Sequence, residues 1–198
     1  MKDFWNERYA NKEYAYGIEP NRFLKEILET IPAGKILFPA EGEGRNGVYA
    51  AKKGFEVFAF DNSVEAKNKA TMLAQKQNVK IDYQLCEFEN LDYTENYFDV
   101  IALIFAHFPH NIRKSYHLKL LSYLKPNGLI IFEAFSKEQI HFNSGGPKQI
   151  EMLFSEEEIK NEFPNIEFKF LETIETNLDE GSFHQGRANV VRFIGTKK

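Results

Sequence analysis

A glycine-containing segment and a later aspartate have the residue types and spacing that bind a nucleoside. Residues 40–47 read Ala-Glu-Gly-Glu-Gly-Arg-Asn-Gly, in which Gly42, Gly44 and Gly47 match the Gly-x-Gly-x-x-Gly pattern between a predicted strand and a predicted helix. Glycine lets the chain turn sharply and lets a ligand approach the backbone closely. Asp61 ends the next predicted strand, where a carboxylate accepts both hydroxyl protons of a ribose. A nucleoside-containing ligand is therefore expected across these strand ends.

Two classes of ligand fit this pattern, and the charges of the loop favour one of them. A dinucleotide would place its pyrophosphate against the loop and the helix N-terminus, whereas S-adenosylmethionine would place its amino acid part and sulfonium there. Glu41 and Glu43 would repel a pyrophosphate, because two like charges 4 Å apart cost about 4 kcal/mol at an effective dielectric constant of about 20. They would attract an ammonium and a sulfonium. Arg45 either pairs with the ligand carboxylate or neutralises a nearby glutamate.

The hydrophobic pattern predicts strands that alternate with helices, which is typical of a parallel sheet in a doubly wound α/β fold. The predicted strands are 35–39, 55–60, 81–86, 98–105, 129–135, 166–174 and 188–196, and the predicted helices are 20–31, 46–53, 63–77, 111–124 and one that begins after Ser155. No helix separates the last two strands. We therefore expect a hairpin there, with residues 175–187 as a polar connection and one terminal strand antiparallel.

Length and composition limit the remaining possibilities. The 198 residues suit a single α/β domain, in which residues 1–34 would form an N-terminal lid or helical segment and residues 35–198 a Rossmann-like core. The net charge of −4 gives no footprint for a nucleic acid backbone. The single cysteine excludes an intramolecular disulfide, and no signal peptide or membrane-spanning run is evident. We expect a cytoplasmic protein that binds neither nucleic acid nor membrane, and the sequence leaves its oligomeric state open.

The loop and its surroundings resemble those of class I S-adenosylmethionine-dependent methyltransferases, especially the small tellurite-resistance and thiopurine-type group. Residues 39–46 stand in place of that family's acid-x-Gly-x-Gly-x-Gly loop with its Arg-Asn ending. Residues 124–128, Leu-Lys-Pro-Asn-Gly, resemble the turn before the fifth strand. Residues 16–21, Tyr-Gly-Ile-Glu-Pro-Asn, resemble the tyrosine-rich segment that folds over the cofactor in that group. The resemblance covers nearly the whole chain.

The resemblance implies a Rossmann-like, mostly parallel seven-stranded sheet with one antiparallel terminal strand, in an α/β three-layer sandwich. It implies S-adenosylmethionine as cofactor, S-adenosylhomocysteine as product, and no metal. Asp61 matches the ribose-binding acid, while Glu87 and Phe88 match the acidic and apolar pair that brackets the adenine. The full set of expected cofactor-binding residues is Tyr9, Ala40, Glu41, Gly42, Gly44, Arg45, Asn46, Asp61, Asn62, Glu87, Phe88 and Phe105.

Two departures from the family pattern keep other functions open. Phe38 stands where the family usually has an acid, and Ala40 replaces the first glycine. Glu41 could supply the missing carboxylate from a different position. If it does not, the chain would be a non-catalytic S-adenosylmethionine-binding or interaction protein. An NAD(P)-dependent oxidoreductase is the third hypothesis, against which Glu41 and Glu43 count.

The expected reaction is methyl transfer to a small molecule by in-line displacement at the methyl carbon. The sulfonium is an activated leaving group, so the protein mainly aligns the reacting atoms and excludes water. A base helps only if the nucleophile carries a proton. His107, after the fourth predicted strand, and His184, in the final hairpin, are the candidate catalytic residues. The acceptor atom stays open among sulfur, selenium, tellurium, oxygen and nitrogen.

Overall fold

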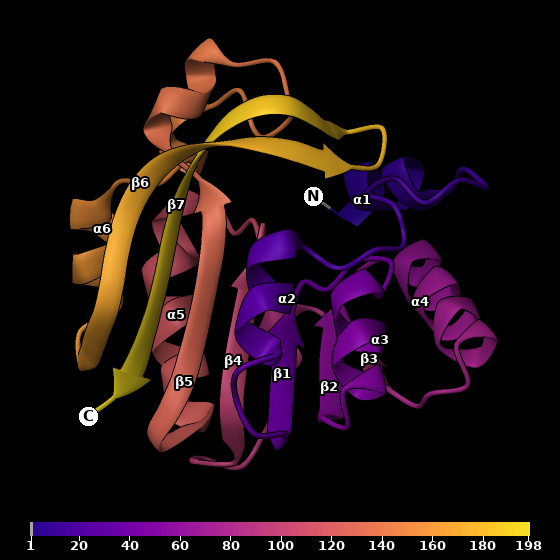
Figure 1. Cartoon of the computed structure of the whole chain (residues 1–198), viewed down its shortest axis with the longest axis horizontal. Helices are drawn as coiled ribbons and strands as arrows, with labels where there is room; N and C mark the ends of the chain where they lie inside the picture. Colours follow the sequence, from indigo (N-terminus) through magenta and orange to yellow (C-terminus); the bar gives the residue numbers. More distant parts are fainter. Residues whose placement is uncertain (1) are drawn as a thin grey trace. The chain divides into compact units, whose positions relative to one another are not determined.

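The computed structural model describes residues 2–198, and its seven strands form one mixed sheet in the order β3-β2-β1-β4-β5-β7-β6 (Figure 1). The strands are β1 (Lys35–Pro39), β2 (Glu56–Asp61), β3 (Asp82–Leu85), β4 (Phe98–Ile104), β5 (Leu124–Phe135), β6 (Ile166–Glu180) and β7 (His184–Lys197). The helices are α1 (Lys2–Tyr9), α2 (Arg22–Leu28), α3 (Arg45–Lys52), α4 (Val64–Lys76), α5 (His110–Tyr123) and α6 (Glu156–Glu162), with short 3₁₀ helices at Phe88–Asn90, Lys137–His141 and Ile150–Met152. The predicted α/β fold, mostly parallel with antiparallel pairing at its C-terminal strands, is confirmed.

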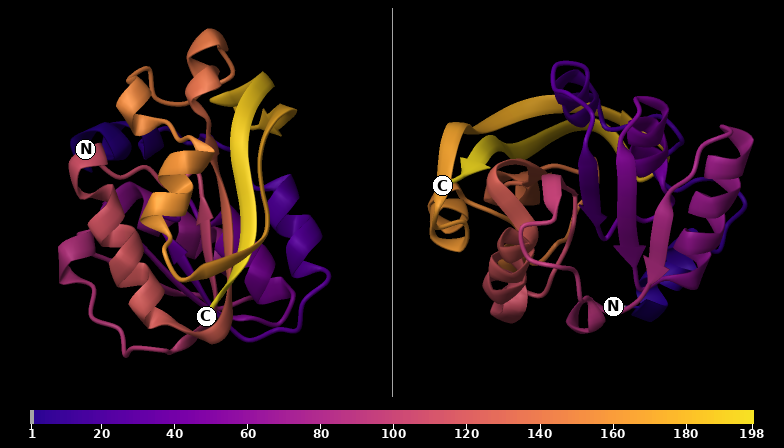
Figure 2. Two further views of the ribbon diagram at one scale, coloured as in Figure 1. Left: turned by 90° about the vertical axis from the view of Figure 1, so that its left-hand side faces the viewer. Right: turned by 90° about the horizontal axis from the view of Figure 1, so that it is seen from below.

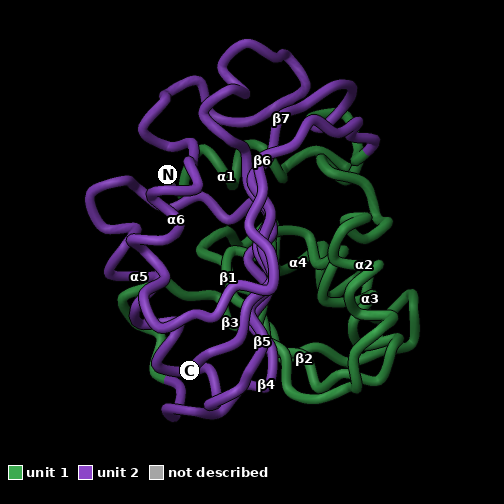
Figure 3. The backbone as a smooth tube through the Cα atoms, turned by 60° about the vertical axis from the view of Figure 1, so that its left-hand side comes forward, with its two compact units in different colours: residues 1–92, 180–183 green, residues 93–179, 184–198 purple. Residues whose placement is uncertain are grey.

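The chain divides into two compact units, which Figure 3 colours separately. The first contains residues up to Asp92 together with the tip of the last hairpin, Glu180–Phe183. The second contains Tyr93–Asp179 and His184–Lys198. The predicted division into a lid at 1–34 and a core at 35–198 stays a prediction.

The first unit carries three parallel strands and four helices. Strand β1 pairs with β2, and β2 pairs with β3, both in parallel register. Short polar residues begin two of the helices, because the side chains of Asn21 and Ser63 accept the backbone N–H groups of Leu24 and Ala66. Helix α3 packs beside α2 and α4, and α1 packs on α4 (Figures 1 and 2). These contacts place the loops that follow β1 and β2 next to α1.

The second unit contains a hairpin that is much longer than the sequence predicts. Strand β4 pairs with β5 in parallel, β5 pairs with β7 antiparallel, and β6 and β7 form a long curved ribbon (Figures 1 and 2). The prediction of a polar connection at 175–187 is wrong, because strand β6 continues to Glu180 and β7 begins at His184. Between Ile174 and Glu180 the exposed positions alternate with sheltered ones, so the polar residues occupy the outward face of a strand. Residues 125–128, expected as a turn, likewise lie within β5.

A buried ionic cluster joins the helices of the second unit. The guanidinium of Arg113 on α5 donates to Glu162 on α6 at 2.7 and 3.0 Å, and Nδ1 of His117 lies 2.8 Å from the same carboxylate. Arg113 also donates to the backbone carbonyls of Glu151 and Leu153. Burial alone would raise the pKa of Glu162, but His117 and Arg113 lower it below its ordinary value. This cluster fixes α6 and the segment before it on α5.

Replacing Glu162 tests how much this cluster contributes to stability. Glu162→Gln leaves the guanidinium of Arg113 buried without its main anionic partner, so we expect a loss of roughly 3 kcal/mol in the free energy of unfolding. Urea denaturation at neutral pH measures it. Glu157→Gln, on the exposed side of the same helix, should stay within about 0.5 kcal/mol of the parent. Equal losses in the two variants would contradict a special role for the cluster.

Candidate functional site

The loop after β1 depends on a left-handed backbone at three positions. Gly42 and Gly44 have φ values of 65° and 87°, and Ala40 adopts a φ of 50°. At Gly44 an added Cβ would lie 2.6 Å from the Cβ of Ala70 on α4, so only glycine allows this approach. Ala40 therefore takes a conformation that glycine adopts more easily, at a cost on the order of 1 kcal/mol. The loop keeps its path despite the missing first glycine.

Two tyrosines lie against Gly42. The hydroxyl of Tyr83 on β3 donates to the carbonyl of Gly42 at 2.6 Å. A Cβ added at Gly42 would lie 2.7 Å from the hydroxyl oxygen of Tyr9, which is buried at the end of α1. The structure thus places Tyr9, expected from the sequence, directly against the glycine loop. Asn6 anchors the same helix, because its side-chain oxygen accepts hydrogen bonds from Ser63 and Val64.

Asp61 lies where the loop meets the end of β2. Its Oδ2 accepts the N–H of Gly42 at 3.1 Å and its Oδ1 accepts the N–H of Ser63 at 2.9 Å. Burial raises the pKa of Asp61 above 3.8, against the lowering effect of these hydrogen bonds. Each carboxylate oxygen has a second lone pair. The carboxylate is therefore oriented by the backbone and still has acceptor capacity for two hydroxyl groups.

Three further expected residues lie at the ends of β2 and β3. The side-chain amide of Asn62 donates to Oε2 of Glu87 at 2.9 Å. The Phe88 ring packs edge-on against that of Phe60, with centroids 5.9 Å apart. The structure brings Asn62, Glu87 and Phe88 to the same corner of the first unit as Asp61. Their roles toward a ligand stay predictions.

The two glutamates of the loop are engaged in ways that the sequence does not reveal. Oε1 of Glu41 accepts the N–H of Gly47 at 2.6 Å, in the first turn of α3. Burial raises the pKa of Glu41 from 4.5 to about 8. Glu43 forms an ion pair with Lys69 at 2.6 Å and accepts the N–H of Ala15 at 2.8 Å. Burial raises the pKa of Glu43 as well.

These contacts change the reason why the loop disfavours a pyrophosphate. The sequence argument rests on repulsion between free negative charges. In the structure Glu41 is largely protonated at neutral pH and Glu43 is paired. The obstacle is instead that Glu41 occupies the N–H of Gly47 at the helix N-terminus, where a phosphate would bind.

Arg45 and Asn46 belong to a buried polar cluster that includes the hairpin tip. Nη2 of Arg45 donates to Oε2 of Glu180 at 2.8 Å, and both side chains are more than nine-tenths buried. The side-chain amide of Asn21 donates to Oε1 of Glu180 at 2.9 Å. The N–H of Asn21 donates to Oδ1 of Asn46 at 2.9 Å. Of the two partners that the sequence leaves open for Arg45, the structure shows a glutamate, although one from a distant part of the chain.

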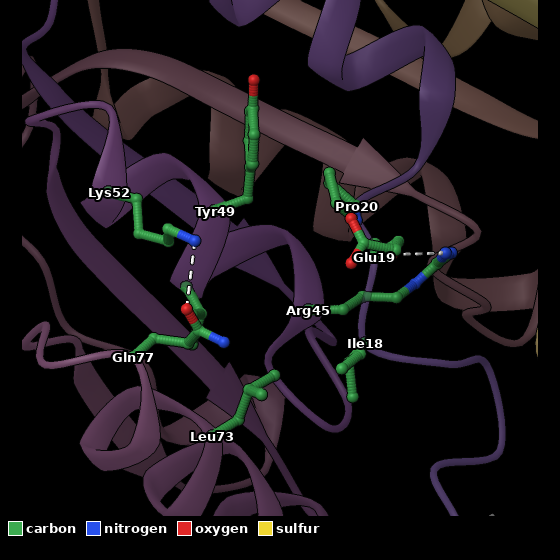
Figure 4. Close-up of a pocket in the computed structure, with 9 residues that line it drawn as sticks. Ile18, Glu19, Pro20, Arg45, Tyr49, Lys52, Leu73 and Gln77 are labelled. Carbon is green, nitrogen blue, oxygen red and sulfur yellow. Dashed lines mark hydrogen bonds between the residues drawn. The ribbon is translucent and has the colours of Figure 1, made fainter.

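A small surface pocket lies beside Arg45 and is shown in Figure 4. It has a volume of about 50 Å³ and is lined by residues of the N-terminal segment, α3 and α4, among them Ile18, Pro20 and Tyr49. Ligand pockets for molecules of nucleoside size or larger measure roughly 300–1,000 Å³. This pocket is therefore too small to be the nucleoside site.

The two candidate catalytic histidines meet in the second unit around one phenylalanine. The rings of His107 and Phe135 are parallel within 5°, with centroids 6.4 Å apart. His184 packs edge-on against Phe105 and Phe135 at 4.6 and 5.1 Å. Nδ1 of His107 is buried, and no residue that the structure describes forms a hydrogen bond with it. Burial lowers the pKa of His107 from 6.5 to about 4, so its imidazole is neutral at physiological pH.

Phe105, expected in the cofactor set, adjoins these histidines. Its φ of 51° is unusual for a non-glycine residue and holds the chain in a sharp bend just after β4. Its N–H donates to the carbonyl of Glu133 at 2.7 Å. The backbone thus turns the Phe105 ring onto Phe135 and His184.

Some residues of the site escape sequence reasoning. Tyr83 and Lys69 lie within ordinary strand and helix patterns, so nothing in the sequence marks them. Glu180 is 135 residues from Arg45 along the chain. The sequence around Glu180 offers one signal, the pair Glu180-Gly181 after a stretch of alternating residues. This pair predicts a turn, but it does not predict that Glu180 binds Arg45. Among residues 2–198 there is no cluster of three or more possible metal ligands, and no helix is long and apolar enough to cross a membrane.

The variant Glu180→Gln tests the buried cluster. It removes the negative charge that faces Arg45, so we expect a loss of roughly 3 kcal/mol in the free energy of unfolding. Glu175→Gln, on the same strand, removes one partner of an exposed pair with Arg187 and should cost less than about 1 kcal/mol. Chemical denaturation of both variants provides the comparison. A loss for Glu180→Gln no larger than that of the control would refute the importance of the pair.

Comparison with known proteins agrees with this geometry. Residues 36–128 match the model of a family described as a methyltransferase domain. The matched range begins in β1 and ends within β5, so it includes the glycine loop and Asp61.

Two curated relatives are methyltransferases. The chain is 32% identical over 114 residues to a ubiquinone biosynthesis O-methyltransferase of Rickettsia prowazekii, covering 58% of this chain and 45% of that protein. It is 31% identical over 99 residues to a tRNA (uracil(54)-C(5))-methyltransferase of Pyrococcus abyssi, covering 44% and 23%. The chain thus spans about half the length, or less, of these curated relatives.

The solved structure of TehB from Haemophilus influenzae has the same fold. It superposes with a TM-score of 0.74 at 18% identity, covering all of this chain and 67% of TehB. At this identity the likeness shows the fold and does not confirm the tellurite-resistance group. The matched methyltransferase domain implies S-adenosylmethionine as the cofactor. Residues 36–128 are therefore similar to a methyltransferase domain, over slightly less than half of the chain.

Proposed function

We propose that the protein transfers a methyl group from S-adenosylmethionine to a small-molecule acceptor. The observation that carries the proposal is the placement of Asp61 at the end of β2. Backbone N–H groups of the glycine loop and of the turn before α4 orient its two oxygens. A carboxylate held in this way favours binding of the two hydroxyl groups of a ribose.

The donor set of the first unit fits the remaining parts of the cofactor. Glu41 occupies the N–H of Gly47, which disfavours a pyrophosphate at the N-terminus of α3. A cation close to Glu41 would also favour ionisation of its carboxyl group, whose pKa of about 8 lies near physiological pH. Glu87 with Asn62 and the ring of Phe88 offer a polar and an apolar surface for the adenosine part.

The bound cofactor supplies an activated methyl group. The residues of this chain position the reacting groups and exclude water from them. Tyr83 and Tyr9 fix the glycine loop, and Asp61 fixes the ribose. The rings of Phe105 and Phe135 provide an apolar surface that excludes water around the histidines. A neutral His107 can accept a proton from a nucleophile that carries one.

The net charge of the chain and the apolar surroundings of the candidate catalytic histidines favour a small-molecule acceptor over a nucleic acid. The net charge is −4, and the candidate catalytic histidines lie among phenylalanine rings. A phosphate backbone requires a cationic surface, and its binding energy comes largely from such contacts. The ubiquinone biosynthesis O-methyltransferase, of which this chain covers 45%, points in the same direction, whereas the chain covers only 23% of the tRNA (uracil(54)-C(5))-methyltransferase.

A non-catalytic cofactor-binding protein is the second candidate. Phe38 is fully buried at the position where the resembled family usually has an acid. Glu41 lies nearby in sequence, but its carboxyl group is engaged with the N–H of Gly47. This candidate predicts cofactor binding with no turnover of any acceptor.

Asp61→Asn tests the ribose contact. The amide lacks the charge that strengthens hydrogen bonds from hydroxyl groups, so S-adenosylhomocysteine should bind more weakly by about 1.5–3 kcal/mol. Isothermal titration calorimetry measures the change, with Asp82→Asn on the exposed side of β3 as the matched control. If Asp61→Asn folds and binds as tightly as the parent protein, Asp61 does not bind the ribose.

His107→Gln tests the acceptor side once an acceptor is found. We expect kcat to fall by about 10²–10⁴-fold if His107 is a general base, with cofactor affinity unchanged. Because the pKa of His107 is lowered to about 4, its basic form persists at neutral pH and is lost only as the pH falls through about 4. The pH profile of kcat should therefore show no decline near 6.5. An equal effect of His110→Gln, on an exposed histidine nearby, would argue against this role.

A further inference from the structure

The proposed cofactor carries a carboxylate that the first unit must accommodate, and the inference below rests on that proposed function. Three carboxyl groups, those of Glu41, Glu43 and Asp61, lie on or beside the loop, and within residues 2–198 only Glu43 among them has a cationic partner there, Lys69. A ligand carboxylate in this partly buried site needs a cationic partner, because an ionised carboxylate that loses its water is costly unless it is paired. The candidates are the basic residues that the structure places around the loop.

Arg45 is the obvious candidate from the sequence, but it is already neutralised. Its guanidinium donates to Glu180 at 2.8 Å and to the carbonyl of Glu19 at 3.4 Å. Both members of the ion pair are more than nine-tenths buried. A ligand carboxylate would have to displace Glu180, which is also held by Asn21. Arg45 is therefore a structural cation.

Lys69 is occupied in the same way. Its ammonium lies 2.6 Å from Glu43 and donates to the carbonyl of Glu13 at 2.7 Å. It also lies 5.1 Å from the centre of the Tyr14 ring. Its contacts tie the N-terminal segment to the loop, and its charge is balanced by Glu43.

Arg8 on α1 differs from both. No carboxylate pairs with it among the residues that the structure describes. Its guanidinium lies over two aromatic rings, 3.9 Å from the centre of Phe183 and 5.0 Å from that of Phe4. Nη1 donates to the hydroxyl of Tyr16 at 3.2 Å. A guanidinium that lies over aromatic rings keeps its edge N–H groups for a planar anion such as a carboxylate.

The neighbours of Arg8 connect it to the glycine loop. The next residue, Tyr9, lies against Gly42, and its ring is 6.4 Å from that of Tyr16, the hydrogen-bond partner of Arg8. Tyr16 also experiences the charges of Glu43 and Arg45. Helix α1 is fixed on the N-terminus of α4 through Asn6. Arg8 is therefore a partly sheltered cation, held in a defined orientation beside the loop.

We propose that Arg8 binds the carboxylate of the cofactor's amino acid part. Phe183 and Tyr16 hold the guanidinium in place, and Phe183 belongs to the hairpin tip that packs in the first unit. Two residues of the hairpin tip therefore act on arginines near the expected cofactor site. Glu180 neutralises Arg45, and Phe183 orients Arg8, the cation that remains for the ligand.

The experiment compares two ligands that differ only in the carboxylate: S-adenosylhomocysteine and its decarboxylated analogue. Calorimetric titration gives both dissociation constants for the parent protein, Arg8→Met, Arg8→Lys and the control Arg22→Met, on an exposed arginine of α2. Arg8→Met should weaken S-adenosylhomocysteine about 10- to 100-fold, the size of a lost charge-assisted hydrogen bond. The decarboxylated analogue should bind Arg8→Met as well as, or better than, the parent protein.

The other variants distinguish recognition from folding. Arg8→Lys keeps the charge and should recover part of the preference for S-adenosylhomocysteine, and Arg22→Met should match the parent protein with both ligands. Equal weakening of the two ligands in Arg8→Met, or unchanged binding of S-adenosylhomocysteine, would overturn the proposal while leaving the cofactor assignment intact. Failure of the parent protein to bind S-adenosylhomocysteine at all would overturn the proposed function and this assignment with it.

Discussion

The buried ion pair between Arg45 and Glu180 is the interaction on which the cofactor side of the protein depends. It joins the first helix after the glycine loop to the tip of a hairpin 135 residues later in the chain. Asn21 adds the N-terminal segment to the same cluster, and Asn46 fixes the backbone of Asn21. An ion pair as buried as this is stable only when the remaining hydrogen-bonding groups of both partners are satisfied. The three segments are thereby held in one arrangement around the glycine loop.

The carboxyl groups of the loop are also compensated inside the structure. Glu43 is balanced by Lys69, and Glu41 avoids a buried charge by a raised pKa and a hydrogen bond to Gly47. Asp61 keeps its orientation because two backbone N–H groups hold it. The carboxyl oxygens of these residues and the guanidinium of Arg8 together suit a ligand with cationic and anionic ends. A dinucleotide would find the N-terminus of α3 already occupied.

The sequence predicts the fold well because local patterns determine most of it. The apolar runs of the buried strands, the Ser63 and Ser155 caps and the glycine loop all act over a few residues, and the structure has each of them. The same reasoning fails at residues 175–187, where a polar composition hides a two-residue alternation. The site is less predictable than the fold. The contacts of Glu180 and Tyr83 and the contact of Arg8 with Phe183 join distant segments, and no local pattern specifies them.

The most direct test of the central claim is a calorimetric titration of the purified protein with S-adenosylmethionine, with NAD as the comparison ligand. The geometry of Asp61, Glu41 and Arg8 predicts binding of S-adenosylmethionine in the micromolar range and no binding of NAD. Binding of NAD in preference, or binding of neither ligand, would contradict the assignment of this loop to S-adenosylmethionine.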